Sequence, residues 1–160
     1  MFFPDPDTPR SQQVIGKCGD TNQGNAGIQL IRYSARQNGS FANLAARNIA
    51  IHAGGLAFDV GGAFGTARVE SDILGAFNVS NLLAVIGALL AAGIPLAQAA
   101  EIAGRLKPVP GRMQTVRAVG NSANKPLIVV DYAHTPDALE KALSTVSAIV
   151  PENGRLISVF

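Results

Sequence analysis

Apolar and polar positions alternate in short runs between Ile28 and Glu70. The runs are separated by Asn38-Gly39, Gly54-Gly55 and Gly61-Gly62, which are residue pairs typical of tight turns. An alternation of period two predicts strands with one buried face and one solvated face. We therefore expect a small antiparallel meander in this part of the chain.

An uncharged stretch follows the predicted meander and indicates helices. Residues 73–100 carry no charged side chain. Their purely apolar core, residues 82–94, is shorter than the roughly 18–20 residues that cross a bilayer. Gly93 and Pro95 interrupt the run. We therefore expect two buried helices joined at these residues, rather than a membrane span.

The last third of the chain has the pattern of a strand, a helix and a second strand. Residues 127–130 form a short apolar run, typical of a strand buried on both faces of a parallel sheet. Thr135 can cap a helix that begins at Pro136, and apolar residues then recur at helical spacing until Pro151. Residues 155–160 return to a strand pattern. We expect a parallel, right-handed βαβ unit.

Two segments of the chain have no clear hydrophobic period. Residues 1–27 are rich in Pro, Asp, Gly, Asn and Gln, so we expect loops with at most one short element. Residues 107–113 contain two prolines and a glycine and cannot continue a helix, because proline lacks an N–H and restricts the preceding residue. This second segment is the best candidate for a domain boundary.

Five polar residues stand at positions where a ligand can bind. Asp131 and His134 follow the carboxyl end of a predicted strand, the usual ligand side of an α/β sheet. Asn78 and Asn81 share one face at the start of a predicted helix, where backbone N–H groups favour anions. Arg112 at the boundary can reach a phosphate or carboxylate. The alternatives are a helix cap with a polar neighbour for the asparagines, and an exposed linker residue for Arg112.

Two further features resemble known sites without fitting them. Gly16-Lys17-Cys18 is similar to the end of a phosphate-binding loop, but Ser11 stands where the first glycine is needed and Cys18 where Ser or Thr is needed. His52 alternates with Ile49 and Ile51, so we expect it on the solvent side of a strand. It has no neighbour at the spacing of a metal ligand.

Composition narrows the classes of protein. The 13 basic and 11 acidic residues are scattered without a basic stripe, which argues against nucleic-acid binding. The single cysteine excludes an internal disulfide framework and a Cys-rich metal site, and fits a cytoplasmic protein. Hydrophobic residues make up 48% of the chain and charged residues 15%, so we expect apolar surface that another segment or chain covers.

Three blocks, in this order, resemble the Mur ligases of bacterial cell-wall synthesis. They are Gly-Ala-Phe-Asn-Val-Ser-Asn at 75–81, Pro-Val-Pro-Gly-Arg-Met at 108–113, and the run at 129–143. The sequence Asp-Tyr-Ala-His-Thr-Pro-Asp-Ala-Leu-Glu at 131–140 is characteristic of one branch. That branch adds a diamino acid, usually meso-diaminopimelate, to UDP-N-acetylmuramoyl-L-alanyl-D-glutamate. The resemblance covers about residues 40–160.

The resemblance implies an α/β fold that is part of a three-domain enzyme. Residues 1–111 would be the tail of the central ATPase domain, an antiparallel meander plus a helix pair. Residues 112–160 would open a Rossmann-like C-terminal domain, truncated after its first βαβ unit, that binds the amino acid. The implied reaction uses ATP and Mg²⁺ to form an acyl phosphate, which the incoming amine attacks. Residues 108–112 would be the pivot for domain closure.

The resemblance also implies roles for the five candidate residues. Asn78 and Asn81 would lie near the adenine of ATP. Arg112 and Asp131 would contact the ribose and phosphates, and His134 would lie beside the γ-phosphate. It assigns no catalytic residue and no metal ligand within this chain.

Several segments of the family are not in this sequence. They are the phosphate-binding loop, the region of a carbamylated lysine, and the Asp-Asn-Pro-Arg motif that selects the amino acid. We therefore expect a partial ligase that alone neither hydrolyses ATP nor forms an amide. The alternatives are a non-catalytic module that completes its fold with another chain, or self-associates through apolar surface, and a related ligase of the lysine-adding or folylpolyglutamate type.

Overall fold

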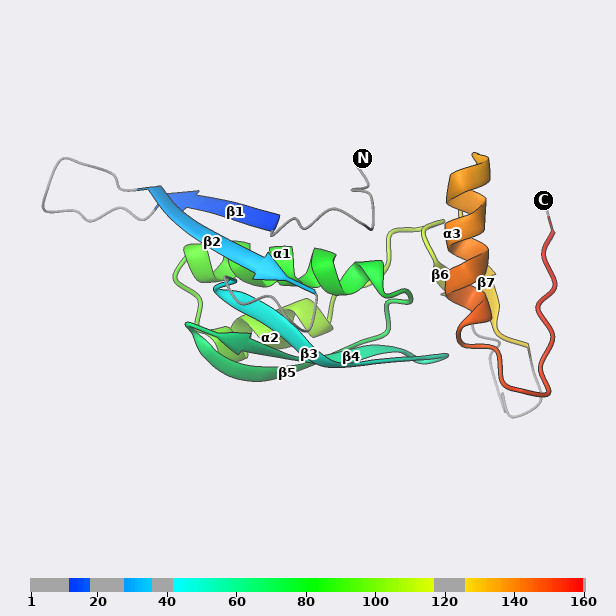
Figure 1. The fold of residues 1–160 in the computed structure, drawn as a ribbon, viewed down its shortest axis with the longest axis horizontal. Helices are drawn as coiled ribbons and strands as arrows, with labels where there is room; N and C mark the ends of the chain where they lie inside the picture. Colours follow the sequence, from blue (N-terminus) through cyan, green and yellow to red (C-terminus); the bar gives the residue numbers. More distant parts are fainter. Residues whose placement is uncertain (1–11, 18–27, 36–41, 117–125, 160) are drawn as a thin grey trace, which may run out of the picture.

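The described residues form seven strands and three helices, in two groups joined by a linker (Figure 1). The structure, a computed structural model, describes residues 12–17, 28–35, 42–116 and 126–159. The larger unit holds β1–β5, α1 and α2, the linker is residues 105–113, and the smaller unit holds β6, β7, α3 and residues 148–159. The elements are β1 Gln12–Lys17, β2 Ile28–Ser34, β3 Leu44–His52, β4 Gly55–Gly62, β5 Gly65–Ser71, α1 Phe77–Ala91, α2 Leu96–Gly104, β6 Gln114–Val116, β7 Ile128–Val130 and α3 Pro136–Ser147.

The sheet of the larger unit has the strand order β1-β2-β3-β4-β5. The strands β3, β4 and β5 form the predicted antiparallel meander. The prediction was wrong between β2 and β3, which run parallel. Asn43 explains the direction, because its side-chain oxygen accepts from the Arg32 N–H at 2.9 Å and its own N–H donates to the Arg32 carbonyl at 2.7 Å. These bonds start β3 beside the end of β2. Asn38 and Gly39, the predicted turn, lie outside the described residues.

Strand β1 is the one element described within the first 27 residues, and it pairs antiparallel with β2. Gly16 and Lys17 belong to this strand. They are therefore paired with β2 in the sheet and do not form a phosphate-binding loop. Cys18, the third residue of the Gly-Lys-Cys sequence, lies outside the described residues.

The hydrophobic core lies between one face of this sheet and the two helices. Helix α1 packs against β1 to β4, and α2 packs against β5 and α1. Leu56, Phe58 and Val60 of β4 are at most 1% exposed, because alternate side chains point to the same face. The predicted buried helix pair is confirmed. Among the described residues, no helix is both long and apolar enough to cross a membrane.

The opposite face of the meander is polar, as the alternation predicted. The Asp59 carboxylate accepts from Asn48 Nδ2 at 2.7 Å and from Arg68 at 3.0 Å. The Asn48 hydrogen bond, with the Arg68 guanidinium beside it, holds the pKa of Asp59 below its usual value. His52 is exposed, as expected, and its ring nitrogen accepts from the Gly54 N–H at 3.1 Å.

Strand β3 carries one irregularity. The register shifts between Arg47 and Ala50, and Asn48 has a φ of 50°, so the strand carries a bulge. The extra residue moves the core-facing positions of β3 from Leu44 and Ala46 to Ile49 and Ile51, so the two isoleucines share one face, as predicted. Ile49 packs against the core, whereas Ile51, which pairs with Leu56 at the end of the hairpin, is 37% exposed.

The smaller unit departs from the predicted βαβ arrangement. Strand β7 pairs antiparallel with β6 in a two-stranded sheet, and its Ile128 and Val130 are 49% and 44% exposed. Residues 155–159 form no strand, so the predicted parallel pairing was wrong. A strand that is buried on both faces needs packed elements on each face of the sheet and a neighbouring strand on each side. The described part of this unit has two strands and one helix, which are too few to bury β7 in this way. The helix is confirmed: Thr135 caps it by accepting from the Ala138 N–H at 3.3 Å.

Gly104, the last residue of α2, permits the close approach of this helix to β5. A Cβ at Gly104 would lie 2.5 Å from the carbonyl oxygen of Glu70. Backbone on both sides must move to accept it, so we expect Gly104→Ala to lower the free energy of unfolding by about 1 kcal/mol or more, despite alanine's better helix propensity. Urea unfolding of the 160-residue chain measures this. Gly61→Ala is the control, because its nearest atom would be at an ordinary 3.5 Å. Equal midpoints for the two variants would contradict the close contact.

Candidate functional site

The two asparagines lie at the start of α1 and bond to each other. Asn81 Nδ2 donates to Asn78 Oδ1 at 2.8 Å, and Asn78 Nδ2 donates to the Leu74 carbonyl at 2.7 Å. Neither is the helix cap, because Ala76 occupies that position. The interpretation of one asparagine as a cap is therefore wrong. Asn78 is half-buried and uses its amide to fix Asn81, which is exposed.

The end of the linker is bound to the end of β7. The Met113 N–H donates to Asp131 Oδ2 at 2.8 Å, and the Tyr132 N–H donates to the Gly111 carbonyl at 2.7 Å. The Gly111 N–H also donates to the side chain of Gln114 at 2.9 Å. Gly111, Arg112 and Met113 therefore move with the smaller unit.

The beginning of the linker is bound to the larger unit. Lys107 forms an ion pair with Asp72, at 2.9 Å, in the segment that precedes α1. The Leu106 N–H still bonds to Ala103 in the last turn of α2. Residues 108–110 are left between the two sets of contacts, and within this stretch the Val109 carbonyl accepts from the Arg112 N–H at 2.9 Å. Two of these three residues are prolines with a fixed φ, so the candidate pivot is narrower than the predicted range of 108–112.

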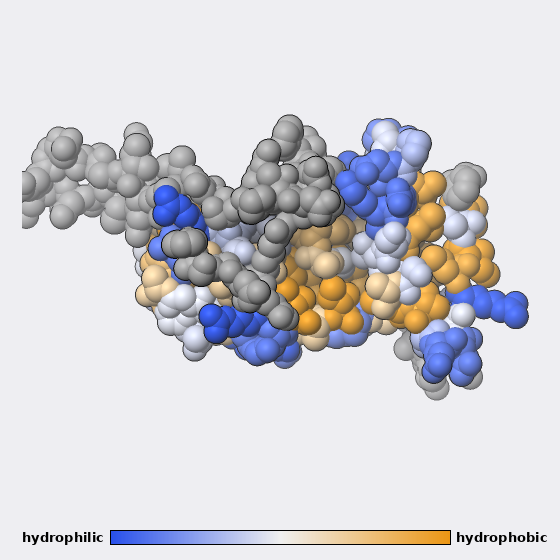
Figure 2. All heavy atoms as spheres, in the orientation of Figure 1, coloured by the Kyte–Doolittle hydropathy of each residue, from blue (hydrophilic) through white to orange (hydrophobic). Residues whose placement is uncertain are grey.

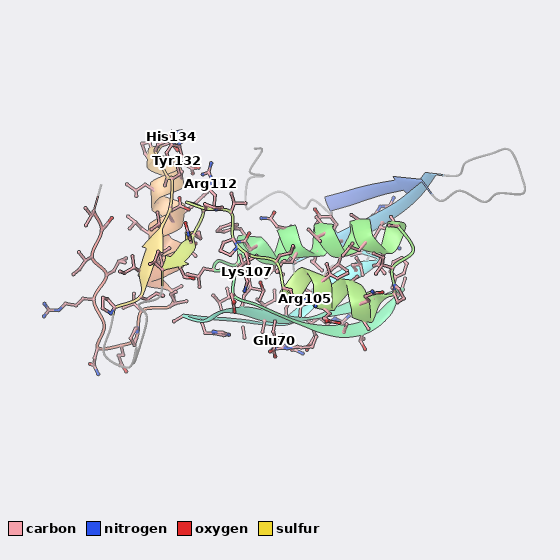
Figure 3. All side chains as sticks on the ribbon, turned by 180° about the vertical axis from the view of Figure 1, so that it is seen from behind. Glu70, Arg105, Lys107, Arg112, Tyr132 and His134 are labelled. Atoms are coloured by element: carbon pink, nitrogen blue, oxygen red, sulfur yellow. The ribbon has the colours of Figure 1, made fainter. Side chains whose placement is uncertain are left out.

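Arg112, Tyr132 and His134 form a cluster on the smaller unit, and Figure 3 shows them together at the end of it where α3 begins. The Arg112 guanidinium carbon lies 5.8 Å from the centre of the Tyr132 ring. The Tyr132 and His134 rings are 5.3 Å apart at an angle of 52°. His134 Nδ1 also lies 3.0 Å from the Tyr132 carbonyl oxygen. All three side chains are exposed.

The structure brings the candidate residues together in two groups. Asn78 and Asn81 belong to the larger unit, and Arg112, Asp131 and His134 belong to the smaller one. Figure 1 shows the start of α1 on the linker side of the larger unit, which agrees with the ion pair from Lys107 to the preceding segment. Within the described residues no hydrogen bond or ion pair joins the two groups.

Sequence reasoning missed Tyr132 as a member of the site. The available signal was its position in a polar turn between Asp131 and His134. An aromatic side chain in such a turn is not needed for the hydrophobic core, which suggests another role. Sequence alone does not show that the residue lies against Arg112, which is 20 positions away in the chain (132 − 112).

Exposed apolar side chains gather on the smaller unit, as the composition predicted. Figure 2 shows hydrophobic atoms at the end of the molecule where β7 and residues 156–159 lie. Helix α3 buries none of its residues fully. A cavity of about 190 Å³ separates its apolar stripe from β7 and residues 156–159. Ile157 and Val159 are 82% and 93% exposed.

A larger cavity, of about 590 Å³, lies on the polar face of the meander. Arg47, Asp59 and Arg68 are among its lining residues. The predicted site residues do not line it. Asp59 and Arg68 form an ion pair there at 3.0 Å.

Comparison with known proteins identifies the class. Residues 111–160 match the family described as Mur ligase, glutamate ligase domain. The solved structure of a UDP-N-acetylmuramoyl-L-alanyl-D-glutamate--2,6-diaminopimelate ligase has a TM-score of 0.60 and 38% identity, over 75% of this chain and 23% of that chain. MurF from Acinetobacter baumannii, at 20% identity and a TM-score of 0.58, shares the fold. The chain is homologous to the Mur ligases, and the predicted family and α/β fold class are confirmed.

Two curated relatives have names that match the predicted branch of the family. The chain is 44% identical over 141 residues to UDP-N-acetylmuramoyl-L-alanyl-D-glutamate--2,6-diaminopimelate ligase of Ralstonia nicotianae, covering 84% of this chain and 27% of the relative. It is 48% identical over 106 residues to the enzyme of the same name from Chromobacterium violaceum, covering 66% and 21%. The chain therefore spans about a quarter of the length of the curated relatives that it matches.

We expect Asp131 to stabilise the linker through the Met113 N–H. The Met113 side chain is 3% exposed, so removing the acceptor leaves a poorly solvated donor, at a cost of about 1–3 kcal/mol. In Asp131→Ala the Met113 amide should exchange hydrogen about tenfold faster or more, as measured by NMR on the 160-residue chain. Asp131→Asn is the control, because its amide oxygen can still accept. Unchanged exchange in Asp131→Ala would show that this bond does not hold the linker.

Proposed function

We propose that this chain is part of an ATP-dependent amide ligase of peptidoglycan-precursor synthesis in the cytoplasm. The ligase would add meso-diaminopimelate, or another diamino acid, to UDP-N-acetylmuramoyl-L-alanyl-D-glutamate. The observation that carries the proposal is the 44% identity, over 84% of this chain, to a relative whose name states that acceptor and that amino acid.

The proposed domain division places residues 1–111 in the central domain and residues 112–160 in the C-terminal one. Two observations support it. The family match begins at residue 111, and the hydrogen bonds of Gly111 and Met113 lead to the smaller unit. The five-stranded sheet and its two helices have a core of their own on the other side of the linker.

The side chains of the two groups fit the parts of ATP. The exposed Asn81 amide offers a donor and an acceptor, which the edge of adenine requires, and Asn78 holds it in place. Asp131 has a second carboxylate oxygen, which accepts no hydrogen bond from the described residues and suits a ribose hydroxyl. Arg112 supplies donors for phosphate oxygens, and His134 lies against the same Tyr132 ring as Arg112. When bound, ATP would supply the phosphoryl group that activates the acceptor carboxylate as an acyl phosphate.

The described residues offer fewer groups for binding Mg²⁺ than for binding ATP. No group of three or more acidic, histidine or cysteine side chains lies together in the part that the structure describes. We therefore assign Mg²⁺ to the nucleotide of the complete enzyme and assign it no ligand among the described residues.

Closure of the two units would complete the nucleotide site. Arg112, Asp131 and His134 belong to the smaller unit by their contacts, and the asparagine pair lies at the start of α1, which is on the linker side of the larger unit (Figure 1). Rotation about residues 108–110 would change the distance between the groups without disturbing the contacts within either. The Lys107–Asp72 ion pair and the Met113–Asp131 hydrogen bond mark the two fixed ends of that pivot.

A chimeric ligase tests the proposal. The segment of the Ralstonia nicotianae ligase that aligns with this chain would be replaced by the corresponding residues of this chain. We expect ADP formation that requires both the muramoyl dipeptide and diaminopimelate. Arg112→Ala in the chimera should lower kcat/KM for ATP about 10- to 100-fold, the effect of losing one charged hydrogen bond. Arg105→Ala, an exposed arginine paired with Glu101 at the other end of the linker, is the control. A folded chimera without activity would refute the proposed function.

A non-catalytic module that completes its fold with another chain is the second candidate. The exposed Leu156, Ile157 and Val159 favour it, because contiguous apolar surface of this kind marks a contact site or an aggregation-prone surface. Residues 155–159 also have no strand neighbour in the described structure, so their backbone groups are available for pairing with another strand.

Light scattering after size-exclusion chromatography separates the two candidates. If the chain is part of a ligase, the isolated 160-residue polypeptide should associate heterogeneously as its concentration rises. Ile157→Lys should reduce this association, because Ile157 is 82% exposed on the apolar surface. Val109→Lys is the matched control, since Val109 is 68% exposed in the linker. A single oligomer of fixed size that Ile157→Lys dissociates would favour the second candidate.

A further inference from the structure

Tyr132 is held in the turn after β7 by its backbone. Its N–H donates to the Gly111 carbonyl at 2.7 Å, and its own carbonyl lies 3.0 Å from His134 Nδ1. Its side chain, however, is 68% exposed. A large aromatic side chain with this exposure adds little to the core. Among the described residues, the contacts of its ring are with Arg112 and His134.

The Tyr132 ring is the contact that orients Arg112. The guanidinium carbon is 5.8 Å from the ring centre, within the ~6 Å range of a cation–π interaction. In the described structure the Arg112 side chain makes no ion pair and no hydrogen bond. Its backbone is fixed by the Arg112 N–H bond to the Val109 carbonyl at 2.9 Å, but without the ring its long side chain would be free to rotate.

The same residue orients His134. A carbonyl oxygen only accepts hydrogen bonds, so the contact with the Tyr132 carbonyl requires a proton on His134 Nδ1. That bond and the ring contact at 5.3 Å fix the plane of the imidazole. The other ring nitrogen, Nε2, is then left for a ligand. The structure thus places the Tyr132 ring in contact with both Arg112 and His134.

We propose that Tyr132 is a positioning residue of the nucleotide site, which holds Arg112 and His134 together for the phosphates of ATP. The electron-rich face of an aromatic ring attracts a guanidinium, so the Tyr132 ring keeps Arg112 on the side of the turn where His134 lies. Figure 3 shows the three side chains gathered at one end of the smaller unit. The inference rests on the proposed function, because it names a further residue of the same site.

The first test needs only the 160-residue chain. The ring current of Tyr132 should shift the NMR signals of the Arg112 side-chain protons upfield. Tyr132→Leu should abolish that shift, and Tyr132→Phe should keep it, because the ring is retained and the hydroxyl is not used. The amide spectrum outside the turn reports whether Tyr132→Leu folds. Arg112 signals that are the same in the folded wild type and in Tyr132→Leu would overturn the inference.

The second test uses the active chimera and separates binding from catalysis. Tyr132→Leu should raise KM for ATP about three- to tenfold and leave KM for diaminopimelate unchanged, with Tyr132→Phe close to the wild type. If Tyr132 acts through Arg112, adding Tyr132→Leu to Arg112→Ala should cost less than it does alone. An equal loss in both backgrounds, or a loss that Tyr132→Phe shares, would refute the positioning role. An inactive chimera with the wild-type segment would refute the proposed function instead, whereas the spectra test Tyr132 without it.

Discussion

Two hydrogen bonds fasten the end of the linker to the end of β7, one from the Met113 N–H to Asp131 Oδ2 and one from the Tyr132 N–H to the Gly111 carbonyl. They enclose Arg112 between two fixed residues. Gly111 has a φ of 71° and Met113 a φ of 45°, both in the left-handed region. Glycine adopts it freely, but methionine does so at a cost of about 1–2 kcal/mol. The bond to Asp131 and the burial of the Met113 side chain offset that cost.

Local patterns predicted the elements that one stretch of chain determines by itself. The Thr135 cap, the helix pair around Gly93 and the alternation in β4 depend on neighbours a few positions apart. The errors came from contacts between distant residues. The parallel pairing of β2 and β3 depends on Asn43 reaching Arg32, and the antiparallel pairing of β7 depends on its contact with β6. No local period reports either of these contacts.

In the candidate site, too, the features set by nearby residues were predicted and those set by distant residues were not. Asp131 and His134 were predicted as site residues because they follow the carboxyl end of a strand. Helical spacing predicted the contact between Asn78 and Asn81, which the 2.8 Å hydrogen bond confirms. The second role of Asp131, as an acceptor for Met113, could not be predicted from the sequence, because it joins residues 18 positions apart in the chain. Tyr132 was missed for the same reason.

The two units place their site residues by different means. Asn78 rests on a helix whose other face is buried in a core, so packing sets its position. Arg112, Asp131 and His134 belong to a unit in which α3 buries no residue fully, so packing cannot set theirs. Backbone hydrogen bonds and the Tyr132 ring do this instead. Such contacts join residues 111–113 directly to 131–134, so these segments must match each other in conformation.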